Sequence, residues 1–305
     1  MAKLPKVTVT QASVGKLISK SNFSGYDMTL SSYVGCSFGC LACYVPHFLK
    51  DDGPWGSWVR VRKHMANKLP NELDKIGPTR LFLGCMSDPY QPIEKTEKIT
   101  RQALQLIEAA RRPMKKVGIF TRSPLVLRDM DLIAQLPRGR VHFTINPYDE
   151  ATRAVLEPMS CPVSDRWDAI KQLKDAGIRV HVNVAPCFPI VSDRMIDELA
   201  ERMAELQVEE FFVDAYQRYP ASVKRIEADP PPNWAQIDKI VRDRAAYKVW
   251  KKAFHIKWTD AWKRVAHKSP DTMPLACDHE NKMKVNMNTG EWLDWEQYDS
   301  YEQGK

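Results

Sequence analysis

The feature that most constrains the fold is an alternation of short apolar runs with amphipathic stretches between residues 79 and 215. Residues 79–84 are typical of a buried strand, and residues 95–111 place their apolar side chains at helical spacing. The alternation continues with strands predicted at 117–120, 141–145, 178–185 and 210–213 and helices at 125–136, 164–176 and 192–206. Such alternation predicts βαβ units and a parallel sheet. With a first strand near residues 26–33 there are about six units, which predicts an α/β fold with a full or partial (β/α)6 barrel.

Three regions follow from this pattern. We expect an N-terminal segment over residues 1–27, the partial barrel over residues 28–215 and a mainly helical C-terminal extension over residues 216–305. The proline run at 230–232 cannot continue a helix, so the extension breaks there. A long helix is predicted over residues 233–268, followed by a polar, strand-poor tail over 269–305.

The chain carries neither a membrane-spanning run nor the apolar stretch of a signal peptide near its first residue. We therefore expect a cytoplasmic protein with no membrane partner. In that compartment the seven cysteines are expected to be free thiols or metal ligands rather than disulfides.

Three of these cysteines form a compact cluster. Cys36, Cys40 and Cys43 lie within eight residues, in the order C-x₃-C-x₂-C, with a glycine beside each of the first two. Three thiolates at this spacing can surround one metal centre, and three ligands to a four-iron cluster leave one iron open. A zinc site with His47 as fourth ligand is the alternative. Covalent haem attachment is disfavoured because Tyr44 stands where a histidine would be required.

Further motifs follow the triplet along the chain: 84–94 (GCMSDPYQPIE), 120–123 (FTRS), 127–129 (LRD), 143–146 (FTIN), 156–158 (LEP), Arg166 and 184–186 (VAP). In this order, the triplet and the motifs resemble the radical S-adenosylmethionine (SAM) superfamily, and within it the spore photoproduct lyase family of DNA-repair enzymes and their relatives. The resemblance covers roughly residues 28–215, whereas residues 216–305 carry no motif that we can place.

The resemblance implies that Cys36, Cys40 and Cys43 hold a [4Fe–4S] cluster whose open iron binds SAM. An electron, supplied by a donor such as flavodoxin or ferredoxin, would cleave SAM to methionine and a 5′-deoxyadenosyl radical that abstracts a hydrogen atom from the substrate. Polar residues at strand ends are the implied cofactor contacts. Arg122 stands where the lyases have Lys and Thr144 where they have Ser, and either cation can pair with a carboxylate. The implied contacts are Ser87, Asp88, Arg122, Thr144 and Asn146.

Cys85 is the candidate for direct participation in catalysis. The lyases have a Cys-x-Ser-Asp segment whose thiol returns a hydrogen atom to the substrate radical, and this chain has Cys85-Met86-Ser87-Asp88. The alternative is a small buried side chain, which is how free cysteine usually behaves. Tyr44 matches one of two tyrosines in the lyases' radical relay, but Ala42 replaces the other. The resemblance therefore implies a different regeneration route or a different reaction.

The net charge of +7 is concentrated in one segment. Residues 233–268 contain ten Lys and Arg against three Asp, which leaves 35 of each sign in the rest of the chain. Four aromatic side chains recur there every fourth residue, so they share one face of a helix. This face is predicted either to pack against the barrel or to stack on bases, while the cations contact phosphates. A membrane-surface helix is a further alternative. The candidate phosphate contacts are Lys248, Lys251 and Lys252.

The sequence thus predicts a radical SAM enzyme of the lyase or isomerase type. Its expected substrate is a nucleic acid or nucleotide, at a pyrimidine, and its expected reaction is hydrogen abstraction followed by C–C bond cleavage or rearrangement. The alternatives are a radical SAM enzyme that acts on a peptide or small metabolite and, from another class, a non-catalytic, zinc-stabilised nucleic-acid-binding protein.

Overall fold

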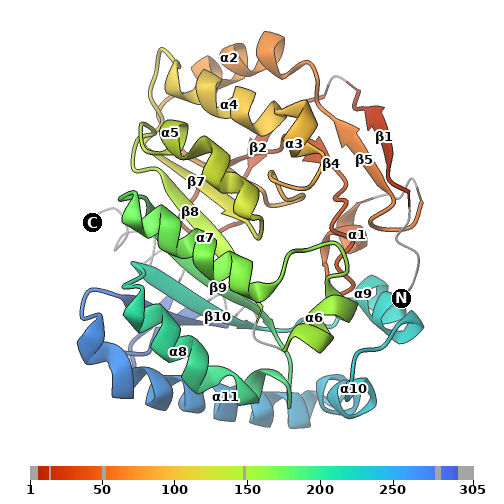
Figure 1. The fold of residues 1–305 in the computed structure, drawn as a ribbon, viewed down its shortest axis with the longest axis vertical. Helices are drawn as coiled ribbons and strands as arrows, with labels where there is room; N and C mark the ends of the chain where they lie inside the picture. Colours follow the sequence, from red (N-terminus) through yellow and green to blue (C-terminus); the bar gives the residue numbers. More distant parts are fainter. Residues whose placement is uncertain (1–5, 14, 50–52, 147–148, 279–282, 295–305) are drawn as a thin grey trace.

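An open, mostly parallel sheet forms the centre of the molecule in the computed structural model, which describes residues 6–13, 15–49, 53–146, 149–278 and 283–294 (Figure 1). Within these residues the sheet has ten strands in the order β13-β12-β11-β10-β9-β8-β7-β6-β3-β2. In chain order the strands are β2 (Ile18–Lys20), β3 (Met28–Leu30), β6 (Arg80–Leu83), β7 (Lys116–Thr121), β8 (Arg140–Ile145), β9 (Arg179–Cys187), β10 (Glu210–Ala215), β11 (Met273–Asp278), β12 (Met283–Asn286) and β13 (Trp292–Asp294).

The predicted α/β fold with a partial barrel is confirmed. Strands β3, β6, β7, β8, β9 and β10 pair in parallel with one another in this order, and helices connect most of them on the outer side of the sheet (Figure 1). In the described residues the two edge strands, β2 and β13, do not pair with each other, so the barrel is open. The helices that follow the strands are α3 (Glu94–Glu97), α4 (Ile99–Glu108), η1 (Pro124–Asp129), α5 (Met130–Ile133), α6 (Glu150–Leu156), α7 (Val163–Asp175), η2 (Ser192–Arg194) and α8 (Ile196–Glu205).

A smaller, three-stranded sheet lies beside the barrel and was not predicted. Its strands are β1 (Thr8–Gln11), β4 (Tyr33–Val34) and β5 (Trp58–Val61), in the order β1-β5-β4. Helix α1 (Val45–Phe48) precedes β5, and α2 (Met65–Ile76) follows it and packs against α4. The small sheet therefore lies next to the cysteine triplet, because β4 ends immediately before the first of the three cysteines.

The C-terminal region differs from the prediction in two respects. The single helix expected over 233–268 is divided at Asp243, whose carboxylate caps a new helix by accepting the N–H groups of Ala245 and Ala246. The tail expected to lack strands forms β11, β12 and β13, of which β11 extends the sheet in parallel beside β10. The helices here are α9 (Pro220–Ala228), α10 (Trp234–Arg242), α11 (Arg244–Val265) and η3 (Ala266–Lys268).

The aromatic face of α11 packs inward, as one of the two sequence interpretations predicted. Phe254, Trp258 and Trp262 are fully buried, and the last two rings contact Phe211 of β10. This face joins α11 to the main core, which is built from the apolar residues of β6 to β10 and the inner faces of the helices. None of the described helices is long and apolar enough to span a membrane.

Candidate functional site

The cysteine loop, residues 35–44, lies between β4 and α1 at the carboxyl ends of the barrel strands. Gly35 and Gly39 have positive φ angles of 81° and 61°. A Cβ atom at Gly35 would lie 2.6 Å from the Trp58 ring, so a larger residue cannot replace this glycine without displacing β5.

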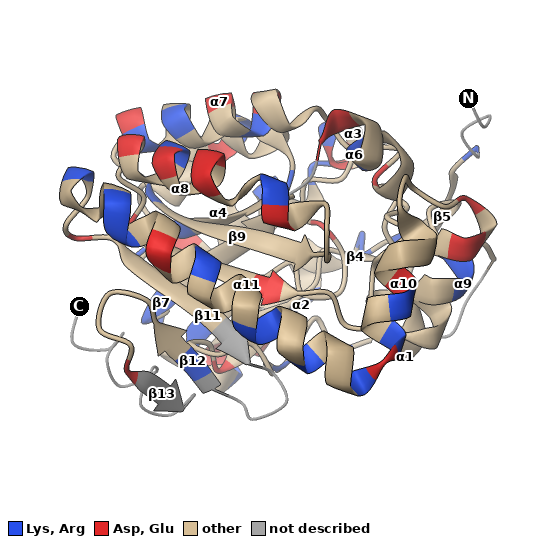
Figure 2. Cartoon of the chain, turned by 90° about the horizontal axis from the view of Figure 1, so that it is seen from below, with Lys and Arg blue, Asp and Glu red and all other residues tan. Residues whose placement is uncertain are grey.

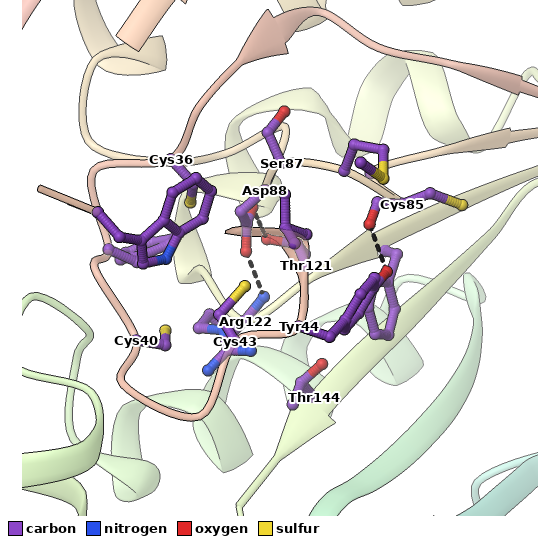
Figure 3. A pocket seen from close by; sticks show the side chains of 16 residues that line it. Cys36, Cys40, Cys43, Tyr44, Cys85, Ser87, Asp88, Thr121, Arg122 and Thr144 are labelled. Carbon is purple, nitrogen blue, oxygen red and sulfur yellow. Dashed lines mark hydrogen bonds between the residues drawn. The ribbon is translucent and has the colours of Figure 1, made fainter. Parts of the chain in front are cut away.

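All three cysteines of the loop line one cavity of about 80 Å³ (Figure 3). Cys36 is buried, and Cys40 and Cys43 are half-buried. Burial raises the pKa of Cys36 to about 12, although the backbone N–H groups of Asp88 and Phe38 point to its sulfur and act in the opposite direction. Burial also raises the pKa of Cys40 and of Cys43. These thiols would become thiolates only beside a strong positive centre, which is what a bound metal provides.

The donor set fits an iron–sulfur cluster. Three soft thiols face one cavity, and backbone N–H groups approach the sulfurs of Cys36 and Cys43. Among the described residues, no three side chains of His, Cys, Asp or Glu are placed to share a single metal ion.

Gln91 holds the first half of the cysteine loop. Its side-chain carbonyl accepts the Ser37 N–H at 2.8 Å, and its amide group donates to the Gly35 carbonyl at 3.3 Å. Gln91 is completely buried and follows β6 in the GCMSDPYQPIE segment. This role could not be predicted from the sequence, because a glutamine between a tyrosine and a proline gives no sign of the loop that its side chain contacts.

Four of the five predicted cofactor contacts lie at this cavity: Ser87, Asp88, Arg122 and Thr144 (Figure 3). Asp88 is engaged by the protein, since it accepts hydrogen bonds from the Thr121 hydroxyl and from the backbone N–H groups of Tyr90 and Arg122. Burial raises the pKa of Asp88 despite these bonds. Asn146 lines neither this cavity nor the larger one that adjoins it, and instead bonds to Arg166 and to the Ala185 carbonyl.

A buried ion-pair network fixes Arg122. Its guanidinium pairs with Glu157, which also pairs with Arg166 at 2.6 Å and accepts a hydrogen bond from Ser160 at 3.1 Å. Burial would raise the pKa of Glu157, but the two guanidinium groups outweigh it and hold the pKa at about 2. Glu157 is therefore ionised at neutral pH and orients Arg122 at the edge of the cavity, a role that the sequence did not indicate.

Cys85 and Tyr44 lie side by side and line both this cavity and a second, larger one. The Tyr44 hydroxyl donates a 2.6 Å hydrogen bond to the backbone carbonyl of Cys85. Figure 3 shows the Cys85 side chain pointing away from the three cysteines of the loop. Burial raises the pKa of Cys85 to about 11, so at neutral pH it is a thiol that retains its hydrogen.

The larger cavity, of about 440 Å³, adjoins the first and shares Cys40, Cys43 and Arg122 with it. Asn183 also lines it; its side chain is fully buried, and neither its amide nitrogen nor its carbonyl oxygen has a hydrogen-bond partner among the described residues. The cavity thus offers apolar ring surfaces and an unused donor–acceptor pair. Its aromatic lining comprises Phe23, Tyr44, Phe48, Phe82, Phe120, Phe212, Tyr216 and Tyr219.

The three predicted phosphate contacts lie in the first half of α11 and line neither cavity. Lys248 and Lys252 are exposed, and Lys251 is half-exposed. Farther along the chain, Lys257, Arg264 and Lys268 form ion pairs with acidic residues of η2 and α8. Figure 2 shows α11, with blue basic positions along it, near α8, which carries red acidic positions.

Comparison with known proteins gives three findings. The family model of the radical SAM superfamily matches residues 30–203. An uncharacterised protein of Methanocaldococcus jannaschii is 32% identical over 190 residues, which cover 62% of this chain and 71% of that protein. A radical SAM Nα-GlyT isomerase of Pseudomonas phage M6 is 25% identical over 197 residues, which cover 63% of this chain but only 40% of the phage protein.

The fold is also similar to that of spore photoproduct lyase. A structure of a mutant of that enzyme with bound AdoMet and dinucleoside spore photoproduct has a TM-score of 0.63 and 17% sequence identity, covering 87% of this chain and 80% of the lyase chain. At this identity the similarity concerns the fold alone.

Proposed function

Because this chain belongs to the radical SAM superfamily, whose members are enzymes that use a [4Fe–4S] cluster and SAM, we propose that its substrate is a nucleic acid or nucleotide and that it reacts at a pyrimidine. When bound, the cluster and SAM supply the radical that abstracts a hydrogen atom. The reaction that we propose is the cleavage or rearrangement of a C–C bond in the substrate, which makes the enzyme a lyase or isomerase.

The observation that carries this proposal is the larger cavity beside the cysteine loop. Its volume of about 440 Å³ suits a small ligand or an extruded nucleotide. Aromatic faces favour planar rings, since stacking on them does not depend on the identity of the base. The unpaired carboxamide of Asn183 offers a donor and an acceptor side by side, which complements the N–H and C=O groups of a pyrimidine edge.

The residues of the smaller cavity are proposed to bind the cofactors. Cys36, Cys40 and Cys43 would ligate the cluster, and Arg122, oriented by Glu157, would pair with the carboxylate of SAM. Ser87, Thr144 and Asp88 would complete this site, with Asp88 acting mainly on the backbone around it. The bonds of Asn146 favour a supporting role behind Arg166 over direct contact with the cofactor.

Cys85 is proposed to return a hydrogen atom to the substrate radical. Its position in both cavities supports this role, because a donor must reach the substrate as well as the site of hydrogen abstraction. Transfer of the hydrogen atom breaks the S–H bond, forms a C–H bond and leaves a thiyl radical on Cys85. Tyr44, whose hydroxyl bonds to the Cys85 carbonyl, would transfer its phenolic hydrogen atom to the thiyl radical, which restores the thiol and leaves a tyrosyl radical. One electron from the donor protein and one proton would then restore Tyr44.

The first half of α11 is proposed to contact phosphates through Lys248, Lys251 and Lys252. A low-potential donor such as flavodoxin or ferredoxin would supply the electron, and the free thiols suit a reducing cytoplasm.

The test is anaerobic reconstitution followed by turnover. We expect about four irons per chain and formation of 5′-deoxyadenosine that an oligonucleotide stimulates more than a peptide does. A colourless zinc protein would contradict the enzymatic function, and stimulation only by a peptide or small metabolite would contradict the substrate class.

A matched pair of variants tests Cys85. We expect Cys85→Ala to cleave SAM as before while the distribution of substrate products changes. Cys161→Ala is the control, since Cys161 is half-buried and lines neither cavity. Identical products from the Cys85 variant and the parent would remove the hydrogen-donor role.

A further inference from the structure

The second half of the cysteine loop is held by the C-terminal extension, which lies outside the residues matched by the family model. Arg225, half-buried on α9, donates from Nε to the Leu41 carbonyl at 3.1 Å and from Nη2 to the Cys43 carbonyl at 2.5 Å. A single planar guanidinium thus spans the two carbonyl groups on either side of Ala42. Lysine, with one ammonium group, cannot reproduce this geometry.

Apolar contacts join the same two parts of the chain. Leu41 and Ala42 pack against a separate small core to which α9 and α10 contribute Ile226, Trp234 and Ile237. The Leu41 N–H also bonds to the Leu156 carbonyl at 2.8 Å, and Leu156 belongs to the same core. Ala42 is small enough to fit this close packing.

The extension therefore contacts the cysteine loop in two ways, through the hydrogen bonds of the Arg225 guanidinium and through apolar packing. The extension also contacts the residues that follow Cys43. The ring centroid of Tyr219 lies 6.3 Å from that of Tyr44 and 5.2 Å from that of His47, which belongs to α1. Gln91 anchors the first half of the loop and Arg225 the second half, so the cysteine ligands are fixed from opposite sides.

We propose that Arg225 is a positioning residue of the cluster site, which fixes the backbone at Cys43 and places a positive charge where it favours reduction of the cluster. Reduction adds one negative charge, and a cation in a half-buried setting stabilises the more negative state. The extension would thus help to set the reduction potential. This inference depends on the cofactors of the family and not on the identity of the substrate.

The experiment compares three variants after anaerobic reconstitution, by iron content per chain and by a redox titration followed by electron paramagnetic resonance. For Arg225→Gln we expect lower iron content and about a tenfold lower ratio of reduced to oxidised cluster at a fixed potential, equivalent to a shift of about 59 mV to more negative values. For Arg225→Lys we expect a potential close to that of the parent but a lower iron content, because the charge remains while one carbonyl loses its donor.

Lys224→Gln is the matched control, since it removes one positive charge from an exposed position of the same helix. We expect it to retain the iron content and the potential of the parent. Unchanged iron content and potential in Arg225→Gln, or an equal shift in Lys224→Gln, would overturn the proposal. If Arg225→Gln does not fold, the result for Arg225→Lys decides. An iron content equal to that of the parent would overturn the positioning role. A lower iron content together with a reduction potential equal to that of the parent would support it. Neither readout involves the substrate, so a wrong substrate assignment cannot produce these results.

Discussion

Replacing Glu157 with glutamine should destabilise the protein strongly, because it breaks a buried ion-pair network. The side chain of Glu157 is 2% exposed, and its partner Arg166 is fully buried. Glu157→Gln keeps the size of the side chain but removes its charge, which leaves the Arg166 guanidinium without this counter-ion in the interior. It also frees Arg122 at the edge of the cavity from its partner carboxylate.

Two independent considerations give the magnitude. Removing one partner of a buried ion pair typically costs about 3–5 kcal/mol. The pKa of Glu157, about 2 in the folded protein against the ordinary value of 4.5, corresponds to about 3 kcal/mol at about 1.4 kcal/mol per pH unit. Because the folded protein lowers this pKa, the stabilisation is fully present above pH ~4.5 and is lost as the pH falls toward ~2.

The assay is urea denaturation of the reduced, metal-free protein, followed by tryptophan fluorescence at neutral pH and at several pH values between about 5 and 3. At neutral pH we expect the free energy of unfolding of Glu157→Gln to be about 3 kcal/mol below that of the parent. Below pH ~4.5 the difference should shrink, because the parent loses the contribution of the ionised carboxylate while the variant has none to lose.

Glu150→Gln is the matched control. Its carboxylate also pairs with an arginine, but its side chain is 53% exposed, and exposed pairs contribute at most about 1 kcal/mol. If Glu157→Gln and Glu150→Gln unfold at the same urea concentration, or if Glu157→Gln and the parent show the same acid dependence, the ion-pair network around Glu157 does not stabilise the fold.

Three further changes have expected outcomes. Cys40→Ala should abolish cluster binding, measured as iron per chain, whereas Cys161→Ala should retain it; iron retained by the Cys40 variant would contradict the ligand assignment. Trp258→Ala should lower the free energy of unfolding by about 3–5 kcal/mol, measured with urea, whereas Ile256→Ala, at a side chain that is 53% exposed, should change it little. The triple variant Lys248→Gln, Lys251→Gln, Lys252→Gln removes three charges from α11. In a plot of the logarithm of the nucleic-acid binding constant against the logarithm of the salt concentration, its slope should be smaller by about 0.7–0.9 for each phosphate that is no longer neutralised. An unchanged slope would contradict the phosphate role.

The central sheet could be predicted because each parallel strand is buried on both faces and therefore appears as a short apolar run between helices. This held for β6 to β10, whose strands and intervening helices lie where the periodicity placed them, within a few residues, except for α6, which was not predicted. Strands β11 to β13 were missed. Pro274 lies inside β11, and because proline is disfavoured within a strand, the short apolar run over residues 273–277 was not recognised as one. Its place in the sheet depends on pairing with β10, about 60 residues earlier in the chain.

The cysteine ligand set could be proposed because its spacing is local, whereas the residues that hold the loop could not. Gln91 and Arg225 act on the loop from about 50 and 180 residues away. The sequence does not distinguish a buried glutamine or arginine from an exposed one, and only the fold shows which carbonyl or N–H group such a side chain contacts. Glu157 was visible as part of the family's LEP segment, but its two arginine partners come from the end of β7 and from α7. Asn183 carried no signal at all, because what distinguishes it is a buried carboxamide without a partner among the described residues.

The structure also changes the meaning of the net charge. Of the ten cations in residues 233–268, three are paired with acidic residues of η2 and α8. These pairs all lie in the second half of α11 and in η3, so that end of the segment offers little to an anionic partner. The first half differs, since the Tyr247 hydroxyl bonds to the Tyr216 carbonyl and Tyr216 lines the larger cavity. Any attraction for phosphate is therefore expected where α11 adjoins the proposed substrate site, and the test of that expectation rests on Lys248, Lys251 and Lys252 rather than on the total charge of the chain.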